Sequence, residues 1–234
     1  MSDLVSGLTH AVELIIFGDA GLREIVLLSF QVSGIALVLA ALVGLPIGAW
    51  LGLCRFRGQG LALALIYTGM GLPPVVVGLF VYLILSRQGP LGYLNWLFTA
   101  HAMVVAQAII AAPLIAGFAM AAIGGVDPEL RRQLTSLGAT PSQSMIAVMR
   151  EARAGVVVAL VAGFGGIISE VGAVMLVGGN IEGATRVLTT AIVLETRQGQ
   201  FDHAIALGII LLALSFAINL VVLLLQGRGT MART

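Results

Sequence analysis

The sequence predicts an all-α polytopic membrane protein with five transmembrane helices. Of its 234 residues, 59% are hydrophobic and only 10% are charged, whereas a soluble domain has about 25% charged residues. A helix needs roughly 20 apolar residues to cross about 30 Å of hydrocarbon. Five stretches meet this length: residues 25–53, 61–85, 100–123, 156–177 and 204–225.

The flanking segments divide the chain into three parts. We expect residues 1–24 to be an extracytoplasmic, interfacial segment with a short helix over 8–17. This segment has no basic residue before Arg23 and so lacks the basic beginning of a cleavable signal peptide. Residues 25–225 are the expected transmembrane domain, with a polar loop at 125–153, and residues 226–234 are a tail.

The arginines predict the orientation in the membrane. All twelve basic residues are arginine, and the side that carries more of them faces the cytoplasm. One side carries Arg55, Arg57, Arg131, Arg132, Arg150, Arg153, Arg228 and Arg233, and the other carries Arg23, Arg87, Arg186 and Arg197. We therefore expect the N-terminus outside, and the 125–153 loop and the C-terminus in the cytosol.

Glycine and proline patterns distinguish the helices from plain membrane anchors. Gly44, Gly48 and Gly52 are four residues apart, a spacing that lets two helix backbones approach closely in lipid. Prolines interrupt three predicted helices, which favours a bundle with a path through it. They are Pro46, the pair Pro73–Pro74, and Pro113.

Several function classes are disfavoured. The net charge of +1 argues against a nucleic-acid partner. Cys54 is the single cysteine, and the three histidines are far apart, so we expect no metal site. No phosphate-binding loop or nucleophile elbow is present. We therefore expect a non-catalytic membrane subunit that binds no cofactor and cannot hydrolyse ATP by itself.

The stretch "GVDPELRRQLTSLGATPSQS" interrupts this apolar chain at residues 125–144. Asp127 is a good N-cap, Pro128 suits the first helical position, and Glu129 suits the positive end of the helix dipole. Gly138 can take the left-handed conformation that ends a helix. The pattern predicts a short cytosolic helix and a glycine corner.

A second helix is predicted immediately after this corner. Thr140 is its expected cap and Pro141 its first residue, with Gln143 in the reciprocal position of a capping box. In the first helix, Leu130, Leu134 and Leu137 fall on one stripe, with Arg131, Arg132 and Gln133 off it. A solvated loop helix is the alternative interpretation of this stretch.

The same stretch resembles the EAA loop of ABC importer permeases. The match centres on Leu137, Gly138 and Ala139, with residues 127–130 in register. The family's Glu-Ala-Ala falls on Arg132, Gln133 and Leu134, and its later Leu-Pro pair on Arg150 and Glu151, so the motif is not complete.

"LPIGAWLG" and "GLPPVVVGL" resemble the first and second core helices of such permeases. "SEVGAVMLVGGNIEGATRVLTTAI", at residues 169–192, resembles tungstate-type permeases closely and molybdate-type permeases more loosely.

This resemblance implies a type I ABC importer permease fold in a prokaryotic cytoplasmic (inner) membrane. It implies a homodimer with two cytoplasmic ABC ATPase subunits, which bind the ATP and Mg²⁺, and an extracytoplasmic oxyanion-binding protein. The loop would dock on the ATPase as a coupling helix. The implied coupling residues are Asp127, Glu129, Leu130, Arg132, Leu134, Leu137, Gly138 and Ala139.

A path for an oxyanion must be lined by hydrogen-bond donors, because moving an isolated dianion from water into hydrocarbon costs tens of kcal/mol.

We expect Thr185 to cap a helix that begins near Arg186. Asn180, Thr185 and Arg186 would then form part of an outer gate; the alternative is an interfacial helix whose arginine reaches the surface. For Glu170 we favour a structural role, pairing with Arg186. The path and gate candidates are Ser169, Gly178, Gly179, Asn180, Thr185, Arg186, Thr189 and Thr190.

Other functions remain open at this stage. A molybdate or sulfate importer permease would share the loop and the topology. A secondary transporter or channel that works without ATP would need inverted repeats and paired intramembrane charges. Neither is visible in the sequence. A purely structural membrane subunit is disfavoured by the capped cytosolic loop.

Overall fold

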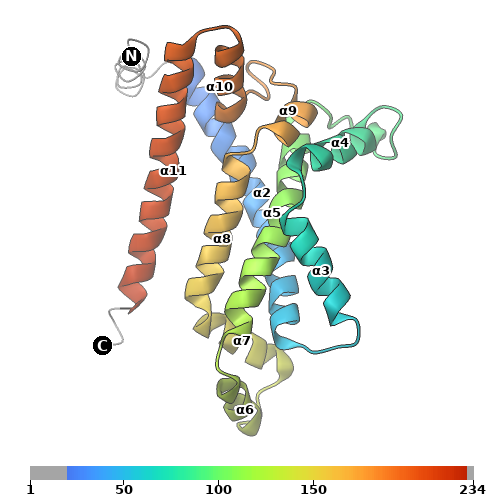
Figure 1. The fold of residues 1–234 in the computed structure, drawn as a ribbon, viewed down its shortest axis with the longest axis vertical. Coiled ribbons are helices and arrows are strands. Elements are labelled where there is room, and N and C mark those ends of the chain that lie inside the picture. Colours follow the sequence, from blue (N-terminus) through green and yellow to red (C-terminus); the bar gives the residue numbers. More distant parts are fainter. Residues whose placement is uncertain (1–19, 231–234) are drawn as a thin grey trace. The chain divides into compact units, whose positions relative to one another are not determined.

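The computed structural model describes residues 20–230, and these contain helices and no strand (Figure 1). The expected helix over 8–17 lies outside the described residues. The helices are α2 (Ala20–Leu53), α3 (Gln59–Met70), α4 (Pro74–Leu85), the short 3-10 helix η1 (Gly92–Leu94), α5 (Ala100–Gly124), α6 (Pro128–Ser136), α7 (Pro141–Glu151), α8 (Arg153–Ile168), α9 (Gly172–Gly178), α10 (Leu188–Arg197) and α11 (Phe201–Thr230).

The chain packs into two compact units. The first unit comprises residues 1–36, 73–107 and 167–234, and the second comprises residues 37–72 and 108–166. Helices α2, α5 and α8 each contribute a segment to both units. The second unit holds the expected coupling loop, and the first holds the expected path residues.

Three of the five predicted spans are single long helices. The segments Gly21–Leu53, Ala100–Gly124 and Phe201–Val222 are each long and apolar enough to cross a membrane. Helix α2 begins at Ala20, so residues 20–24 of the predicted N-terminal segment are helical, and α11 extends to Thr230, into the predicted tail.

The other two predicted spans contain breaks, one of them at the predicted Pro73–Pro74 interruption. Helices α3 and α4 are separated by residues 71–73, and α7 and α8 meet at 75°; each pair has the length and composition of one broken span. The fourth predicted span, over 156–177, also stops at Ile168 and resumes at Gly172 as α9.

Only one of the three predicted proline interruptions occurs. Pro46 and Pro113 lie inside continuous helices α2 and α5. Pro73 and Pro74 separate α3 from α4, and Pro74 takes the first position of α4, where its missing N–H leaves no hydrogen bond unmade. The ring of Pro113 packs against α3 at Gly69, where there is no room for a side chain. A Cβ added to Gly69 would lie 2.7 Å from the Pro113 Cβ.

In the second unit, the three spaced glycines bring α2 against α5. A Cβ at Gly44 would lie 2.7 Å from the Ala112 carbonyl oxygen, and one at Gly48 would lie 2.5 Å from that of Ala116. Real Cβ atoms do not approach backbone oxygens this closely, so only glycine fits. The predicted close approach of helix backbones is confirmed, with α5 as the partner.

In the first unit, α10 folds back onto α2 and α11 (Figure 1). Leu188 and Ala191 of α10 are buried with Leu22 of α2 and with Leu207 and Ile210 of α11. Separately, α4 packs on α9 through Gly78, where a Cβ would meet the Ala173 Cα at 2.6 Å.

We expect Gly48→Ala to destabilise the protein by about 1–3 kcal/mol, because the added methyl group must displace the α5 backbone. Gly34→Ala is the matched control: it lies in the same helix, and its Cβ would meet nothing within 4 Å. Thermal unfolding in detergent should show a lower midpoint for Gly48→Ala only. Equal midpoints for the two variants would contradict this packing.

Candidate functional site

In the second unit, the polar loop folds as the sequence predicts. Asp127 caps α6, its Oδ1 accepting a hydrogen bond from the Glu129 N–H at 2.9 Å, and Pro128 is the first helical residue. Because the acceptor and donor are only two residues apart, this cap forms locally.

The glycine corner after α6 is a complete Schellman motif. The Gly138 N–H donates to the Thr135 carbonyl and the Ala139 N–H to the Leu134 carbonyl, both at 3.0 Å. Gly138 has φ +80°, as predicted, and a Cβ there would meet nothing within 4 Å. The requirement for glycine is therefore a matter of backbone conformation and not of space.

Helix α7 starts with the predicted capping box. The Thr140 N–H donates to Gln143 Oε1 at 2.8 Å, and the Gln143 N–H donates to Thr140 Oγ1 at 3.3 Å. Together with the Schellman motif, this box fixes the turn between α6 and α7 through hydrogen bonds on both sides of Gly138.

The surface of this corner differs from the expected apolar stripe. Leu130 and Leu134 are half-buried, but Leu137 is 84% exposed. Arg131, which the sequence places off the stripe, donates to the Leu53 carbonyl at 2.6 Å and so ties α6 to the end of α2. No local pattern predicts this contact, because the two residues are 78 positions apart. Arg132 pairs with Glu129 at 3.3 Å on the exposed face.

In the first unit, the chain leaves α8 at a break held by side chains from two other helices. The Ile167 carbonyl accepts hydrogen bonds from the Glu170 N–H at 3.2 Å and from Gln107 Nε2 of α5 at 3.0 Å. The Glu170 carbonyl accepts one from Thr189 Oγ1 of α10 at 3.0 Å. The Ile167 and Glu170 carbonyls at the break are thus paired within the protein.

Gln107 was missed by the sequence reasoning. It is 4% exposed, and its Oε1 has no hydrogen-bond partner among the described residues. The available signal was an amide side chain within the otherwise apolar segment 102–123. A buried amide in such a segment needs a partner, and Gln107 finds one at the end of α8.

Glu170 has the structural role we favoured, but not the expected partner. Its Oε1 accepts a hydrogen bond from the Ala173 N–H at 3.0 Å, in the first turn of α9. Arg186 instead pairs with Glu182 at 3.2 Å, four residues earlier. The expected Glu170–Arg186 pair is therefore wrong.

Thr185 does not cap a helix near Arg186. It is fully buried, and its Oγ1 donates to the Gly178 carbonyl at 2.6 Å and accepts from the Ile181 N–H at 2.9 Å. It therefore closes the loop that begins at the end of α9. Gly179, Asn180 and Gly183 in this loop have positive φ angles.

Helix α10 begins at Leu188, two residues later than expected. Thr190 Oγ1 accepts from the Val187 N–H at 3.0 Å, and Ser29 Oγ of α2 accepts from the Leu188 N–H at 2.9 Å. Val187 has no side-chain acceptor, so only the Thr190 half of a capping box is present. Ser29, another buried polar residue that we had not singled out, takes the position of the missing cap.

The path candidates thus differ in accessibility. Thr185 and Thr190 are fully buried and Thr189 is 6% exposed, with their hydroxyls bonded within the protein. Gly178 is buried, Ser169 and Gly179 are exposed, and Asn180 is half-buried with an unpartnered Oδ1.

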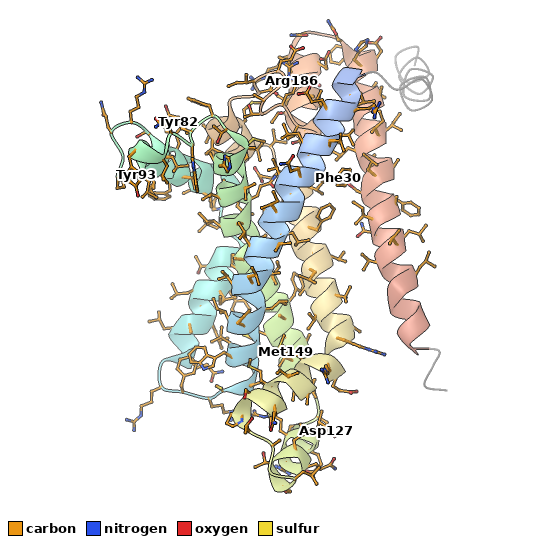
Figure 2. The ribbon with its side chains drawn as sticks, turned by 180° about the vertical axis from the view of Figure 1, so that it is seen from behind. Phe30, Tyr82, Tyr93, Asp127, Met149 and Arg186 are labelled. Carbon is orange, nitrogen blue, oxygen red and sulfur yellow. The ribbon has the colours of Figure 1, made fainter. Side chains whose placement is uncertain are left out.

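Arg186 lies among carboxylates. A cavity of about 60 Å³ is lined by Arg186, Glu182 and Glu24, together with residues of the loop and the start of α2. Two acidic side chains around one arginine make this cavity a poor site for an anion. Figure 2 shows Arg186 near the N-terminal end of α2.

Comparison with known proteins decides the family. Residues 44–228 match the family described as "Binding-protein-dependent transport system inner membrane component". The chain belongs to this family. It is an ABC transporter permease subunit, as the loop motif and the 169–192 segment had indicated.

Individual relatives of this permease support the assignment. The permease is 42% identical over 226 residues to the tungstate uptake system permease protein of Peptoclostridium acidaminophilum, an alignment that covers 97% of this chain and 99% of that protein. It is 31% identical to the molybdenum transport system permease protein of Escherichia coli K12, covering 82% and 88% of the two chains. A crystal structure of a bacterial ABC transporter that imports alginate matches with a TM-score of 0.74 at 21% identity, covering 94% of this permease and 83% of that chain. This structural match shows the shared fold.

We expect the cap at α9 to depend on the shape of Glu170 and not on its charge. Glu170→Gln keeps an Oε1 acceptor for the Ala173 N–H and should leave the free energy of unfolding within about 0.5 kcal/mol of the native value. Glu170→Leu removes the acceptor and should cost about 1 kcal/mol. Thermal unfolding in detergent compares the two. Equal destabilisation by both substitutions would show that the negative charge itself is required.

Proposed function

We propose that this permease is the membrane subunit of an ATP-driven tungstate importer. The observation that carries this proposal is the 42% identity to a tungstate uptake permease along nearly the whole chain, against 31% to a molybdenum permease over a shorter alignment. The 169–192 segment, which resembles tungstate-type permeases, contains the α8–α9 break and the loop after α9.

The assembly we propose is a homodimer with two ATPase subunits, since each chain supplies one capped corner. An extracytoplasmic binding protein would deliver the anion; a related structure of similar fold was solved with a substrate-bound periplasmic protein. The exposed Leu137 and the charged pair Glu129–Arg132 give the corner a surface for docking on the ATPase. Ser169, Gly179 and Asn180 remain candidates for the path.

A transport assay tests the substrate. The permease, its ATPase and its binding protein should be reconstituted in proteoliposomes and offered tungstate, molybdate and sulfate. We expect ATP-dependent uptake with preference for tungstate. Preference for molybdate or sulfate would show that the substrate is that anion and not tungstate. Uptake without ATP would show that transport is not ATP-driven.

Cysteine labelling tests the proposed orientation, which rests on the arginine distribution. In a Cys54→Ser background, a cysteine at Gln133 of α6 should be labelled only from the cytosol. A cysteine at Gln198, which follows α10, should be labelled only from outside. Reversed labelling would refute the orientation and the docking role of the corner.

The glycine corner provides a test of coupling. Gly138→Val should leave the permease inserted but abolish substrate-stimulated ATPase activity, because a β-branched residue at φ +80° costs at least about 1–2 kcal/mol. Gly138→Asn is the matched control, since asparagine adopts this conformation more readily and nothing crowds its side chain. Arg132→Glu should weaken docking less, because Arg132 is exposed. Normal substrate-stimulated ATPase activity in Gly138→Val would show that the corner at Gly138 does not couple ATP hydrolysis to transport.

A further inference from the structure

We propose that the cavity at the end of α4 is a transient binding site for the oxyanion on the outer side of the permease, with Arg87 as its cation. This inference rests on the proposed function and adds a site to it. The sequence had placed Arg87 on the outer side without giving it a role.

The cavity is formed by the last turns of α4 and the loop that follows. Its volume is about 720 Å³, and its lining includes Tyr82, Ser86, Arg87, Gln88, Asn95 and Phe98. Tyr82 and Phe98 form an edge-to-face pair with ring centroids 6.2 Å apart. Figure 2 shows Tyr82 on α4 and Tyr93 in the following loop. The volume exceeds that of a small tetrahedral anion, so the cavity would hold the anion with part of its hydration shell.

The charge of the lining suits an anion. Arg87 is the one charged residue among the lining residues, and none of them is acidic. No aspartate or glutamate occurs anywhere between residues 25 and 126. Within residues 20–230, Arg87 makes no ion pair. The cavity at Arg186 has the opposite character, because two carboxylates share it.

Hydrogen-bond donors are arranged beside this charge. The Arg87 guanidinium offers a planar set of N–H donors that matches tetrahedral oxyanions, and Tyr82 and Gln88, whose side chains carry further donors, are among the lining residues. Asn95 Nδ2 donates a hydrogen bond to the Tyr93 carbonyl at 3.2 Å, and Ser86 Oγ donates one to the Leu83 carbonyl at 2.9 Å. These two side chains therefore stabilise the wall of the cavity.

The loop that carries these groups is held in place by its own backbone. The Gly89 N–H donates to the Ser86 carbonyl at 2.8 Å, and the Leu91 N–H donates to the Ile84 carbonyl at 3.0 Å. The Phe98 N–H donates to the Val177 carbonyl at 2.8 Å, which joins the cavity wall to α9. A preorganised loop reduces the ordering cost of binding, and its bond to α9 places the anion next to the segment that follows the α8–α9 break.

A single exposed arginine gives weak binding, which suits a site that must release its anion. The expected affinity is on the order of millimolar. Such a site raises the local anion concentration after release from the binding protein without retaining the anion, and salt should weaken it.

Tryptophan fluorescence tests the site directly. Trp96 lies between the lining residues Asn95 and Leu97, and Trp50 is the second of two tryptophans in the chain. In a full-length Trp50→Phe protein, sodium tungstate at constant ionic strength should change Trp96 emission saturably.

Arg87→Ala in that background should raise the half-saturating concentration at least about fivefold, and Arg87→Lys should raise it less. Arg197→Ala, another exposed arginine assigned to the same side, is the matched control and should change nothing. The proposal is overturned if no saturable response occurs, or if Arg87→Ala responds like the parent.

Transport measurements separate this proposal from its alternatives. In proteoliposomes, Arg87→Ala should lower tungstate uptake several-fold while the affinity for the binding protein stays unchanged. A loss of binding-protein affinity without a Trp96 response would make the cavity a protein docking surface and overturn the anion site. If the permease takes up tungstate but its Trp96 emission does not change on addition of tungstate, the anion site is refuted and the proposed function stands. A saturable, Arg87-dependent response in a complex that does not transport tungstate would support the site and refute the proposed function.

Discussion

Backbone hydrogen bonding in apolar surroundings is the constraint on which this structure depends. A buried N–H or C=O without a partner costs about 1–3 kcal/mol, and lipid offers no water to supply one. The chain has few polar side chains, and many of them lie where a helix begins, ends or breaks. Gln107, Thr189 and Glu170 pair the groups released between α8 and α9. Ser29 does the same for the first turn of α10.

The same constraint separates polar residues that hold the fold from those available to a solute. Thr185 and Thr190 look from the sequence like donors for an anion path, yet both hydroxyls are buried and bonded to nearby backbone. Hydroxyl-rich segments in a membrane protein therefore do not identify a path by composition. Accessibility is the better guide, and Ser169 is exposed in the same segment, while Asn180 is half-buried with an unpartnered Oδ1.

The arginines that the sequence assigns to the outer side differ in their surroundings. Arg186 and Arg87 were both assigned to this side by sequence, but their surroundings differ in sign. Glu182 and Glu24 surround Arg186, whereas the cavity at Arg87 contains no acidic residue. An arginine that is already paired contributes mainly to local structure, and an unpaired one in a concave, donor-lined surface contributes a field that an anion can use.

The sequence by itself determined the features that depend on neighbouring residues. The caps at Asp127 and Thr140 and the left-handed Gly138 connect residues two to five positions apart, so residue type at fixed spacing was sufficient. The membrane class and three of the spans followed from apolar length. The Pro73–Pro74 pair indicated the break in the second span, but only the tertiary structure decided where the fourth span breaks and which groups pair across that break. The bond from Gln107 to Ile167 joins residues 60 positions apart, and that from Arg131 to Leu53 joins residues 78 positions apart. Such partners are chosen by helix packing, and helix packing has no local signature.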